Sequence, residues 1–188
     1  MFVQELGVEL ETVEVDLMAG ENRQEDHLTS TPSGQMPTLE LDKGDFISEI
    51  TVICDYLDEL QGYTDLMGKT SEARAETRMW TRRIDLQIVE PLTNGFRFSE
   101  GHDFFKDRLR LIPQAADDLK TLAQERITWL DGQIKDKQFI CGDRFSLADI
   151  MFYCFLNFGT TVGQPLNEDN KNIVNLYNKI HSRPSASA

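Results

Sequence analysis

The stretch GQMPTLEL at residues 34–41 determines how the first third of the chain is interpreted. Its apolar and polar residues alternate as in a half-buried strand, but Pro37 stands near its start and has no N–H to donate. A proline is tolerated at the first residue of a strand. Turn-forming DKG at 42–44 and apolar FI at 46–47 follow. We therefore expect two short strands joined by a tight turn over residues 37–47.

The sequence before this hairpin carries one helical and one strand pattern. Residues 2–6 have apolar residues at helical spacing, and Gly7 is expected to close that short helix. ETVEVD at 11–16 alternates with a period of two, which predicts a strand. The polar residues 19–34 contain turn formers, with room for one irregular helical turn.

The sequence after the hairpin predicts an amphipathic helix. Isoleucine, leucine and cysteine side chains recur at helical spacing within EITVICDYLDEL at 49–60. Ser48 is the expected N-cap, and Gly62 stands just past the end. The elements over residues 1–61 therefore form a small α/β domain of about 60 residues, which is below the usual size for independent stability.

A polar, turn-rich linker at 62–70 separates this domain from a part without strand patterns. The first helical pattern of that part covers residues 71–90, and Pro91 is expected to bend or end it. Since every later pattern is helical as well, the sequence predicts an all-helical bundle over residues 71–188.

Three further helices are predicted within this bundle. The first follows Pro113, and residues that recur every three to four positions define one of its faces: Ala115, Leu119, Leu122, Arg126, Leu130 and Ile134. The second begins at Ser146, where Asp149 three residues later completes a capping pattern. The last covers about residues 169–181, and Pro184 follows it.

Acidic residues outnumber basic ones by 32 to 19, which gives a formal net charge of −13. This charge opposes extended contact with nucleic acid or with an anionic membrane surface. No apolar run approaches the about 20 residues that cross a bilayer. The first ten residues carry two acids and no base, unlike a secretory signal, so we expect a cytoplasmic protein. An anionic ligand would have to be held by helix N-termini and single arginines.

The cysteines give no sign of catalysis or of metal binding. Cys54, Cys141 and Cys154 lie far apart, form no C-x-x-C pair and do not cluster with the three histidines. We interpret all three as structural thiols of the core and expect no metal site. The same spacing argues against disulfide exchange by a dithiol of the protein's own.

Three stretches, in this order, resemble the cytosolic glutathione transferase family. They are PSGQMPTLELDKGDFISEITVICDYLDE at 32–59, FICGDRFSLADI at 139–150 and SRPSA at 182–186. The resemblance covers nearly the whole chain. It implies a thioredoxin-like N-terminal domain followed by an all-helical domain, two such chains paired as a homodimer, and glutathione as the co-substrate.

The resemblance also gives the opening stretch a role. In the family, the residue before the proline offers its backbone N–H and C=O to the cysteinyl part of glutathione, and the proline is cis. Here these residues are Met36 and Pro37. Without the resemblance, a trans proline at a strand's first residue is the favoured explanation of Pro37. Gln35 is a further candidate contact to the peptide.

The start of the following helix is the second expected contact region. By resemblance, Glu49 lies near the ammonium of the γ-glutamyl group, and the free N–H groups of the helix receive its carboxylate. Ile50 stands where the family usually has a serine, so it offers its backbone alone. Either Ser48 supplies the missing hydroxyl or the affinity for glutathione is lower. As a residue without that context, Glu49 stabilises the helix dipole.

The electrophile is expected to bind against NGFRFSEGHDFF at residues 94–105. By resemblance, a pocket for a small hydrophobic electrophile is built from the first helix of the bundle. Phe96 and Phe98 are the candidate apolar wall, and Arg97 is the candidate polar group. The alternative is that these aromatic side chains belong to the core of the bundle.

No residue can be assigned as the group that activates the glutathione thiol. In the family it follows an N-terminal strand, whereas this sequence begins at what matches the later part of the first helix. We therefore expect a thioredoxin-like domain without its first strand, in an N-terminally shortened chain. Two functions stay open: transfer of the glutathione thiolate to an electrophile, and ligand or partner binding without turnover.

Overall fold

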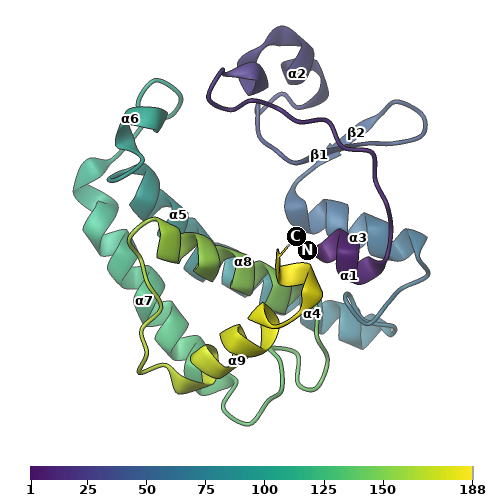
Figure 1. The fold of residues 1–188 in the computed structure, drawn as a ribbon, viewed down its shortest axis with the longest axis vertical. Coiled ribbons are helices and arrows are strands. Elements are labelled where there is room, and N and C mark those ends of the chain that lie inside the picture. The colour runs from purple at the N-terminus through teal and green to yellow at the C-terminus, as the bar shows by residue number, and fades with distance from the viewer. Residues whose placement is uncertain (188) are drawn as a thin grey trace. The chain divides into compact units, whose positions relative to one another are not determined.

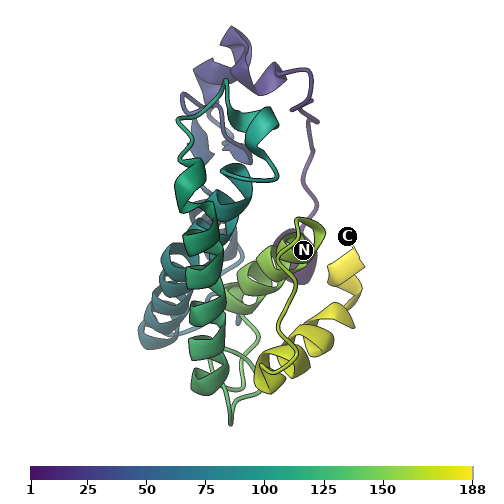
Figure 2. The ribbon, with the colours of Figure 1, turned by 90° about the vertical axis from the view of Figure 1, so that its left-hand side faces the viewer.

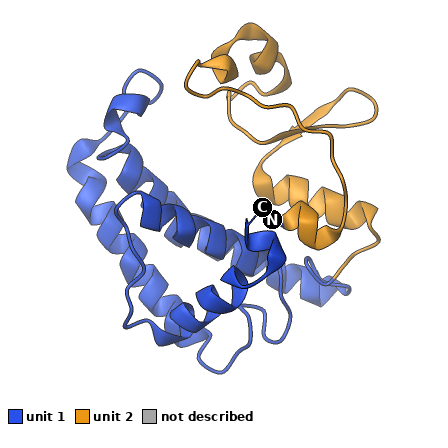
Figure 3. Cartoon of the chain, viewed as in Figure 1, with its two compact units in different colours: residues 1, 65–188 blue, residues 2–64 orange. Residues whose placement is uncertain are grey.

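The computed structural model describes residues 1–187 and divides the chain into two compact units. One unit comprises residues 2–64, and the other comprises Met1 and the residues from Asp65 onward (Figure 3). Both strands of the described residues lie in the first unit, and every regular element of the second unit is a helix. A linker at 62–70 stays a prediction.

The first unit contains three short helices, a 3-10 turn and two strands (Figure 1). In chain order they are α1 (Phe2–Leu6), the 3-10 turn η1 (Glu21–Arg23), α2 (Glu25–Ser30), β1 (Thr38–Glu40), β2 (Phe46–Ser48) and α3 (Ile50–Leu60). Gly7 follows α1 with a φ of 73°, a left-handed conformation that favours glycine. The short first helix, the hairpin and the longer helix after it are therefore confirmed.

The hairpin is a two-stranded antiparallel ribbon with Leu39 opposite Ile47. Its turn is closed by two backbone hydrogen bonds of 2.8 Å, from the Leu41 N–H to the Asp45 carbonyl and from the Gly44 N–H to the Leu41 carbonyl. Gly44 has a φ of 82°, so the turn uses the glycine that the sequence supplies there.

The strand expected at residues 11–16 is not formed. The chain runs there without regular structure, and the Val13 side chain is 90% exposed. An alternating segment becomes a strand only where a neighbouring strand accepts its backbone hydrogen bonds, and no strand of the described residues pairs with this one. The prediction from periodicity was therefore wrong for this structure.

Helix α3 begins one residue later than its sequence pattern suggests. Its N-cap is Glu49, because Ser48 is the last residue of β2 and pairs with Thr38. The predicted cap at Ser48 was therefore wrong. Ile53, Cys54 and Leu57 are buried as expected. Ile50 and Leu60, which periodicity places on the same face, are 42% and 61% exposed at the two ends of the helix.

The second unit is a bundle of helices around α8 (Figure 2). Its elements are α4 (Ser71–Ile84), the π-helical turn η2 (Asp85–Val89), α5 (Glu90–Arg97), α6 (His102–Phe105), the 3-10 turn η3 (Pro113–Ala115), α7 (Ala116–Gln133), α8 (Leu147–Thr161), α9 (Lys171–His181) and the 3-10 turn η4 (Pro184–Ser187). Phe152 of α8 is 1% exposed, among buried side chains of α4, α7 and α9.

Helical structure continues through Pro91, so this proline does not end the helix. Elements α4, η2 and α5 follow one another without a break from Ser71 to Arg97, and Pro91 lies in the first turn of α5. A proline inside a helix donates no hydrogen bond, and its ring crowds the carbonyl four residues earlier. The π-helical turn at Asp85–Val89 is the local change in hydrogen bonding that accommodates it.

The buried face of α7 differs in part from the predicted one. Ala116, Ala123, Ile127 and Leu130 are buried, whereas Leu122 is 39% exposed. Helix α5 packs closely on α7, since a Cβ atom built at Gly95 of α5 would lie 2.7 Å from the Lys120 Cγ and 3.4 Å from the Lys120 backbone nitrogen. The predicted face was chosen by the spacing of the leucines, and it therefore missed part of the face that is buried.

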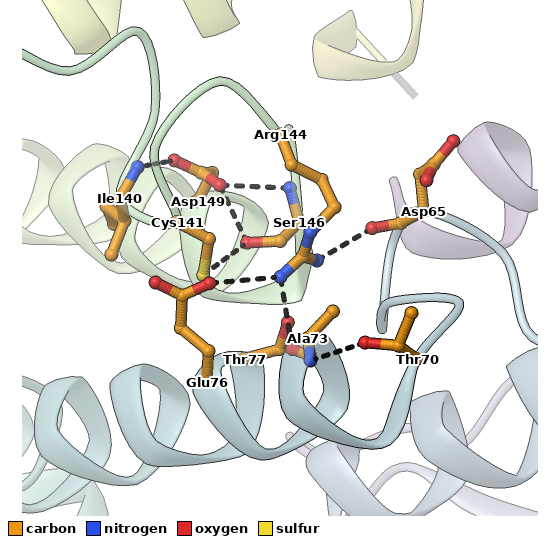
Figure 4. A network of polar contacts seen from close by, with 10 residues as sticks. All are labelled: Asp65, Thr70, Ala73, Glu76, Thr77, Ile140, Cys141, Arg144, Ser146 and Asp149. Carbon is orange, nitrogen blue, oxygen red and sulfur yellow. Dashed lines mark hydrogen bonds and ion pairs between the residues drawn. The ribbon is translucent and has the colours of Figure 1, made fainter.

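Helix α8 begins with the capping arrangement that the sequence predicts. Ser146 is its N-cap, and the Asp149 carboxylate accepts hydrogen bonds from the Ser146 N–H at 2.9 Å and the Ser146 hydroxyl at 2.8 Å (Figure 4). The Ile140 N–H donates to the same carboxylate at 2.8 Å. Both Ser146 and Asp149 are fully buried, so this cap fixes the preceding loop as well as the helix.

Arg144 joins this loop to the start of the helical unit (Figure 4). Its guanidinium donates to the Asp65 carbonyl at 2.8 Å and to the Ala73 carbonyl at 3.1 Å. The same group lies 3.7 Å from the Glu76 carboxylate. One side chain thus satisfies acceptors that the sequence places about 70 positions or more away, as only the folded chain reveals.

Candidate functional site

The β-hairpin brings the two predicted contact regions to one place. In its register Thr38 pairs with Ser48, so Pro37 precedes one member of the last pair and Glu49 follows the other. The Met36–Pro37 segment and the start of α3 therefore meet at the same end of the ribbon. Residues that are 12 or more positions apart in sequence are thereby neighbours in the first unit.

The peptide bond between Met36 and Pro37 is cis, as the family resemblance predicts. Met36 is half-buried, while Gln35 and Pro37 are exposed. Neither the N–H nor the carbonyl of Met36 hydrogen-bonds to another residue within 1–187. An extended peptide ligand can use such a pair of backbone groups in the way that an added strand does.

The loop before Met36 is held by residues that sequence reasoning missed. Asn22 is 4% exposed, and its side-chain amide donates to the Gly34 carbonyl at 2.7 Å. Gly34 has a φ of 63°, and a Cβ atom at this position would lie 2.8 Å from the Asn22 carbonyl oxygen. The Gly34 N–H donates to the Thr31 carbonyl at 2.8 Å, and the hydroxyls of Thr31 and Thr38 are hydrogen-bonded.

Glu49 makes the connection from β2 to α3 in a single residue. Its φ of 75° and ψ of 117° are a conformation that residues with a side chain rarely adopt. Such backbone strain costs about 1–3 kcal/mol and persists where the surrounding structure imposes it, often at binding sites. Here the strand ends at Ser48 and the helix begins at Ile50, so Glu49 absorbs the whole change of direction.

The N-terminus of α3 offers free backbone donors. The N–H groups of Val52 and Ile53 donate to the Glu49 carbonyl, both at 3.0 Å, and no side chain caps the helix. The N–H groups of Ile50 and Thr51 donate to no other residue within 1–187. Free amides at a helix N-terminus favour a carboxylate ligand, and Ser48 beside them is half-buried.

The aromatic residues of the helical unit form a cluster of their own. Phe96 packs edge to face against Phe105 and Phe158, with ring centroids 6.2 and 5.4 Å apart. Phe98 follows α5 as its C-cap and is half-buried. Phe96 therefore contributes to packing between α5, α6 and α8, and Arg97 projects from the last turn of α5 beside this cluster.

The burial of Cys54 and Cys141 does not favour a role as a nucleophile. Cys54 and Cys141 are buried, and burial raises the pKa of the Cys141 thiol, which disfavours the reactive thiolate. Cys154 is exposed on α8, so its predicted place in the core was wrong.

No group of residues within 1–187 has the composition of a metal site. No helix of that part of the chain is long and apolar enough to cross a membrane.

Two protein-family models match the sequence. The N-terminal domain of glutathione S-transferase matches residues 1–60, and the C-terminal domain matches residues 110–184. Glutathione S-transferase F10 of Arabidopsis thaliana is 32% identical over 191 residues, which covers 95% of this chain and 84% of the relative. Human elongation factor 1-gamma is 29% identical over 135 residues, which covers 72% of this chain and 29% of the relative.

Solved structures share the fold along the whole chain. Gtt2 from Saccharomyces cerevisiae superposes with a TM-score of 0.92 at 26% identity, over 99% of this chain and 90% of that one. A glutathione S-transferase-I bound with lactoylglutathione has a TM-score of 0.81 at 18% identity, a likeness of fold. The chain therefore belongs to the glutathione S-transferase family, with a thioredoxin-like domain followed by a helical domain, and glutathione is the co-substrate of that family.

Proposed function

We propose that the protein binds glutathione along Met36 and the start of α3, and transfers its thiolate to an electrophilic small molecule. The observation that carries this proposal is the hairpin register, which places the free backbone groups of Met36 and the free amides of α3 at one end of the ribbon. A tripeptide with a carboxylate at one end has matching groups for both.

Each proposed contact follows from the chemistry of glutathione. Met36 exchanges backbone hydrogen bonds with the cysteinyl residue, next to the cis bond to Pro37. The γ-glutamyl carboxylate accepts from the amide of Ile50, and the Glu49 carboxylate faces its ammonium group. Ile50 brings no hydroxyl, so the half-buried Ser48 is the side chain available for that contact. Exposed Gln35 contributes a polar contact to the peptide.

The chemical step is attack by the glutathione thiolate on the electrophile. A hydrogen-bond donor near the sulfur lowers the thiol pKa and so raises the thiolate fraction near neutral pH. None of the residues described above is assigned this role. On the electrophile side we propose Phe96, Arg97 and Phe98, because they combine aromatic surface with one positive charge.

Calorimetric titration with glutathione and conjugation of 1-chloro-2,4-dinitrobenzene test this proposal together. We expect one glutathione per chain, and we expect Glu49→Gln to weaken binding about tenfold or more, the usual effect of losing a charged hydrogen bond. Glu59→Gln is the matched control, since Glu59 is an exposed acid near the opposite end of α3. The proposal is contradicted if glutathione produces neither a heat of binding nor a rise in the melting temperature.

Binding without turnover is the second candidate function. The match to elongation factor 1-gamma, which is not named for a transferase activity, favours it. So does Ile50 at the position where the family usually has a serine. Calorimetric binding of glutathione, with no conjugate formed from any electrophile tested, identifies this alternative.

A homodimer is the proposed assembly. Met79 and Leu86 are exposed by 40% and 51%, two helical turns apart on α4 and η2. Leu122 and Trp129 of α7 are exposed by 39% and 37% with the same spacing. Trp129 lies beside Trp80 of α4, with ring centroids 6.2 Å apart, so the helices are neighbours.

Light scattering should give the mass of a dimer. We expect Leu86→Glu to reduce the measured mass, whereas Leu60→Glu should leave it unchanged.

Charge and cysteine state support the remaining proposals on partners and location. A net charge of −13 disfavours nucleic acid and anionic membranes as partners. Within residues 1–187 none of Cys54, Cys141 and Cys154 forms a disulfide, as is usual for proteins of the reducing cytoplasm. We therefore place the protein in the cytoplasm.

A further inference from the structure

Arg97 of the helical unit is held in place by uncharged partners. Its guanidinium donates to the side-chain oxygen of Asn94 at 3.0 Å. The amide nitrogen of Asn94 donates in turn to the Glu90 carboxylate at 2.9 Å. Asn94 thus separates the acid from the arginine, and the three side chains run in a line along α5.

Arg97 makes no ion pair within residues 1–187. Other arginines of the same unit do: Arg82 lies 3.2 Å from the Asp85 carboxylate, and Arg144 lies 3.7 Å from that of Glu76. In a chain with 32 acidic and 19 basic residues, Arg97 is one of the half-buried arginines without an acidic partner in the described part of the chain; Arg83, which lies 4.9 Å from the Trp80 ring centre, is another. The Arg97 guanidinium has five N–H donors, and one of them is used by Asn94. Two of the remaining N–H groups can bind both oxygens of a planar anion.

An aromatic wall borders this guanidinium. The guanidinium carbon lies 5.8 Å from the ring centre of Phe105. Phe105 packs edge to face with Phe104 at 4.8 Å and with Phe96 at 6.2 Å. Arg108 covers the face of Phe104 at 3.8 Å. An aryl ring placed against Phe96 and Phe105 therefore lies next to the open donors of Arg97.

We propose that Arg97 recognises an anionic group on the electrophile, so that the acceptor substrates are aromatic compounds that carry a carboxylate. This inference rests on the proposed transfer of glutathione and names the substrate class for it. It replaces a purely hydrophobic electrophile by an amphipathic one, with the ring on the Phe96–Phe105 wall and the carboxylate on the guanidinium. The acidic chain repels anions at long range, so a fixed local cation is what makes such a substrate bind.

The reaction that tests this proposal is aromatic substitution of chloride. The glutathione sulfur forms a bond to the ring carbon, the carbon–chlorine bond breaks and chloride leaves with the bonding pair. The proton of the thiol goes to solvent before the attack. The substrates 4-chloro-3-nitrobenzoate and 4-chloro-3-nitrobenzamide differ in charge and hardly in shape, so their ratio of kcat/KM isolates recognition of the anion.

We expect wild-type protein to prefer the benzoate and Arg97→Gln to lower the benzoate-to-amide ratio about 10- to 100-fold, the range for a lost charged hydrogen bond. Arg97→Lys should keep part of the preference, because lysine retains the charge without the planar fork. Arg82→Gln is the matched control, an exposed arginine of the preceding helix, and should leave the ratio as in wild type. An unchanged ratio in Arg97→Gln overturns the proposal while the transferase function stands.

A binding measurement separates this inference from the proposed function. If neither chloride is converted, the transferase proposal fails, and calorimetry with unreactive 3-nitrobenzoate then decides on Arg97. Binding by wild type that Arg97→Gln weakens at least about tenfold supports anion recognition. Equal binding by the two proteins, or no binding by either, overturns it.

Discussion

Glu49 combines a strained backbone with a proposed role in binding, and substitution can separate the two. Its φ of 75° suits glycine, so Glu49→Gly relieves strain, although glycine also makes the unfolded chain more flexible. We expect a net gain of about 1 kcal/mol in the free energy of unfolding and a lower affinity for glutathione. Glu49→Ala should lower the affinity to the same extent without any gain, since alanine keeps the strain. Thermal melts and calorimetry of both variants test this, and a stabilised Glu49→Ala contradicts it.

Asp149 predicts a dependence of stability on pH. Burial raises its pKa from 3.8 to about 6, against the opposing effect of its hydrogen-bond donors. Because the folded pKa is higher, the folded state binds the proton more tightly. The stabilisation is present below about pH 4 and is lost as the pH rises through about 6.

The size of this effect is at most about 3 kcal/mol, from about two pKa units at 1.36 kcal/mol each. Urea unfolding of wild type and Asp149→Asn between pH 4 and pH 7 isolates it, because the other acids are common to both proteins. We expect the difference in unfolding free energy, wild type minus variant, to fall as the pH rises through this window. A rising difference means that the hydrogen bonds outweigh burial and reverses the assignment.

The N-termini of the helices show what a sequence can predict. The cap of α8 was visible because Ser146 and Asp149 are three residues apart, and a local pattern suffices to specify it. The hairpin was visible for the same reason. The start of α3 was placed at the wrong residue because the strand before it extends to Ser48, and pairing with Thr38 outweighs capping there.

Contacts distant in sequence account for what the patterns missed. The alternating residues 11–16 meet no paired strand in the described part of the chain, and the face that α7 buries depends on its contact with α5, which approaches it closely at Gly95. At the candidate site, the cis Met36–Pro37 bond was expected from family resemblance and is present, and the role of Glu49 in binding stays a proposal from the same resemblance. The supporting contact of Asn22 with Gly34 was not, because a single asparagine in a turn-rich segment carries no such signal.

The start of α9 depends on a contact distant in sequence, and this contact gives a testable prediction. Its N-cap Asn170 makes no side-chain hydrogen bond to the helix, and the Asp131 carboxylate instead accepts from the Ile173 N–H and from the Asn172 side chain, both at 2.9 Å. We expect Asp131→Ala to cost about 1–2 kcal/mol, as other lost caps do. Asp118→Ala, an exposed acid in the first turn of α7, is the control. Urea denaturation measures both, and equal stabilities contradict a capping role for Asp131.

The net charge of −13 should affect glutathione binding. Glutathione has two carboxylates and one ammonium group, so its net charge is about −1 near neutral pH. The chain repels it over distances that salt screens, since the Debye length falls from about 30 Å at 0.01 M to about 8 Å at 0.15 M. The proposed contacts to Met36, Glu49 and Ile50 act over a few ångströms and are screened much less. We therefore expect affinity to rise a few-fold as salt increases over this range.

The diethyl ester of glutathione provides the control for this electrostatic argument. It keeps the ammonium and lacks both carboxylates, so its net charge is about +1 and the acidic chain attracts it. Its affinity should be weaker overall, because the free amides at the start of α3 lose their carboxylate partner. That affinity should fall with added salt, opposite in sign to glutathione itself. If calorimetry shows that both ligands lose affinity with salt, a positive local field dominates the site, and the long-range repulsion inferred from composition is not what limits binding.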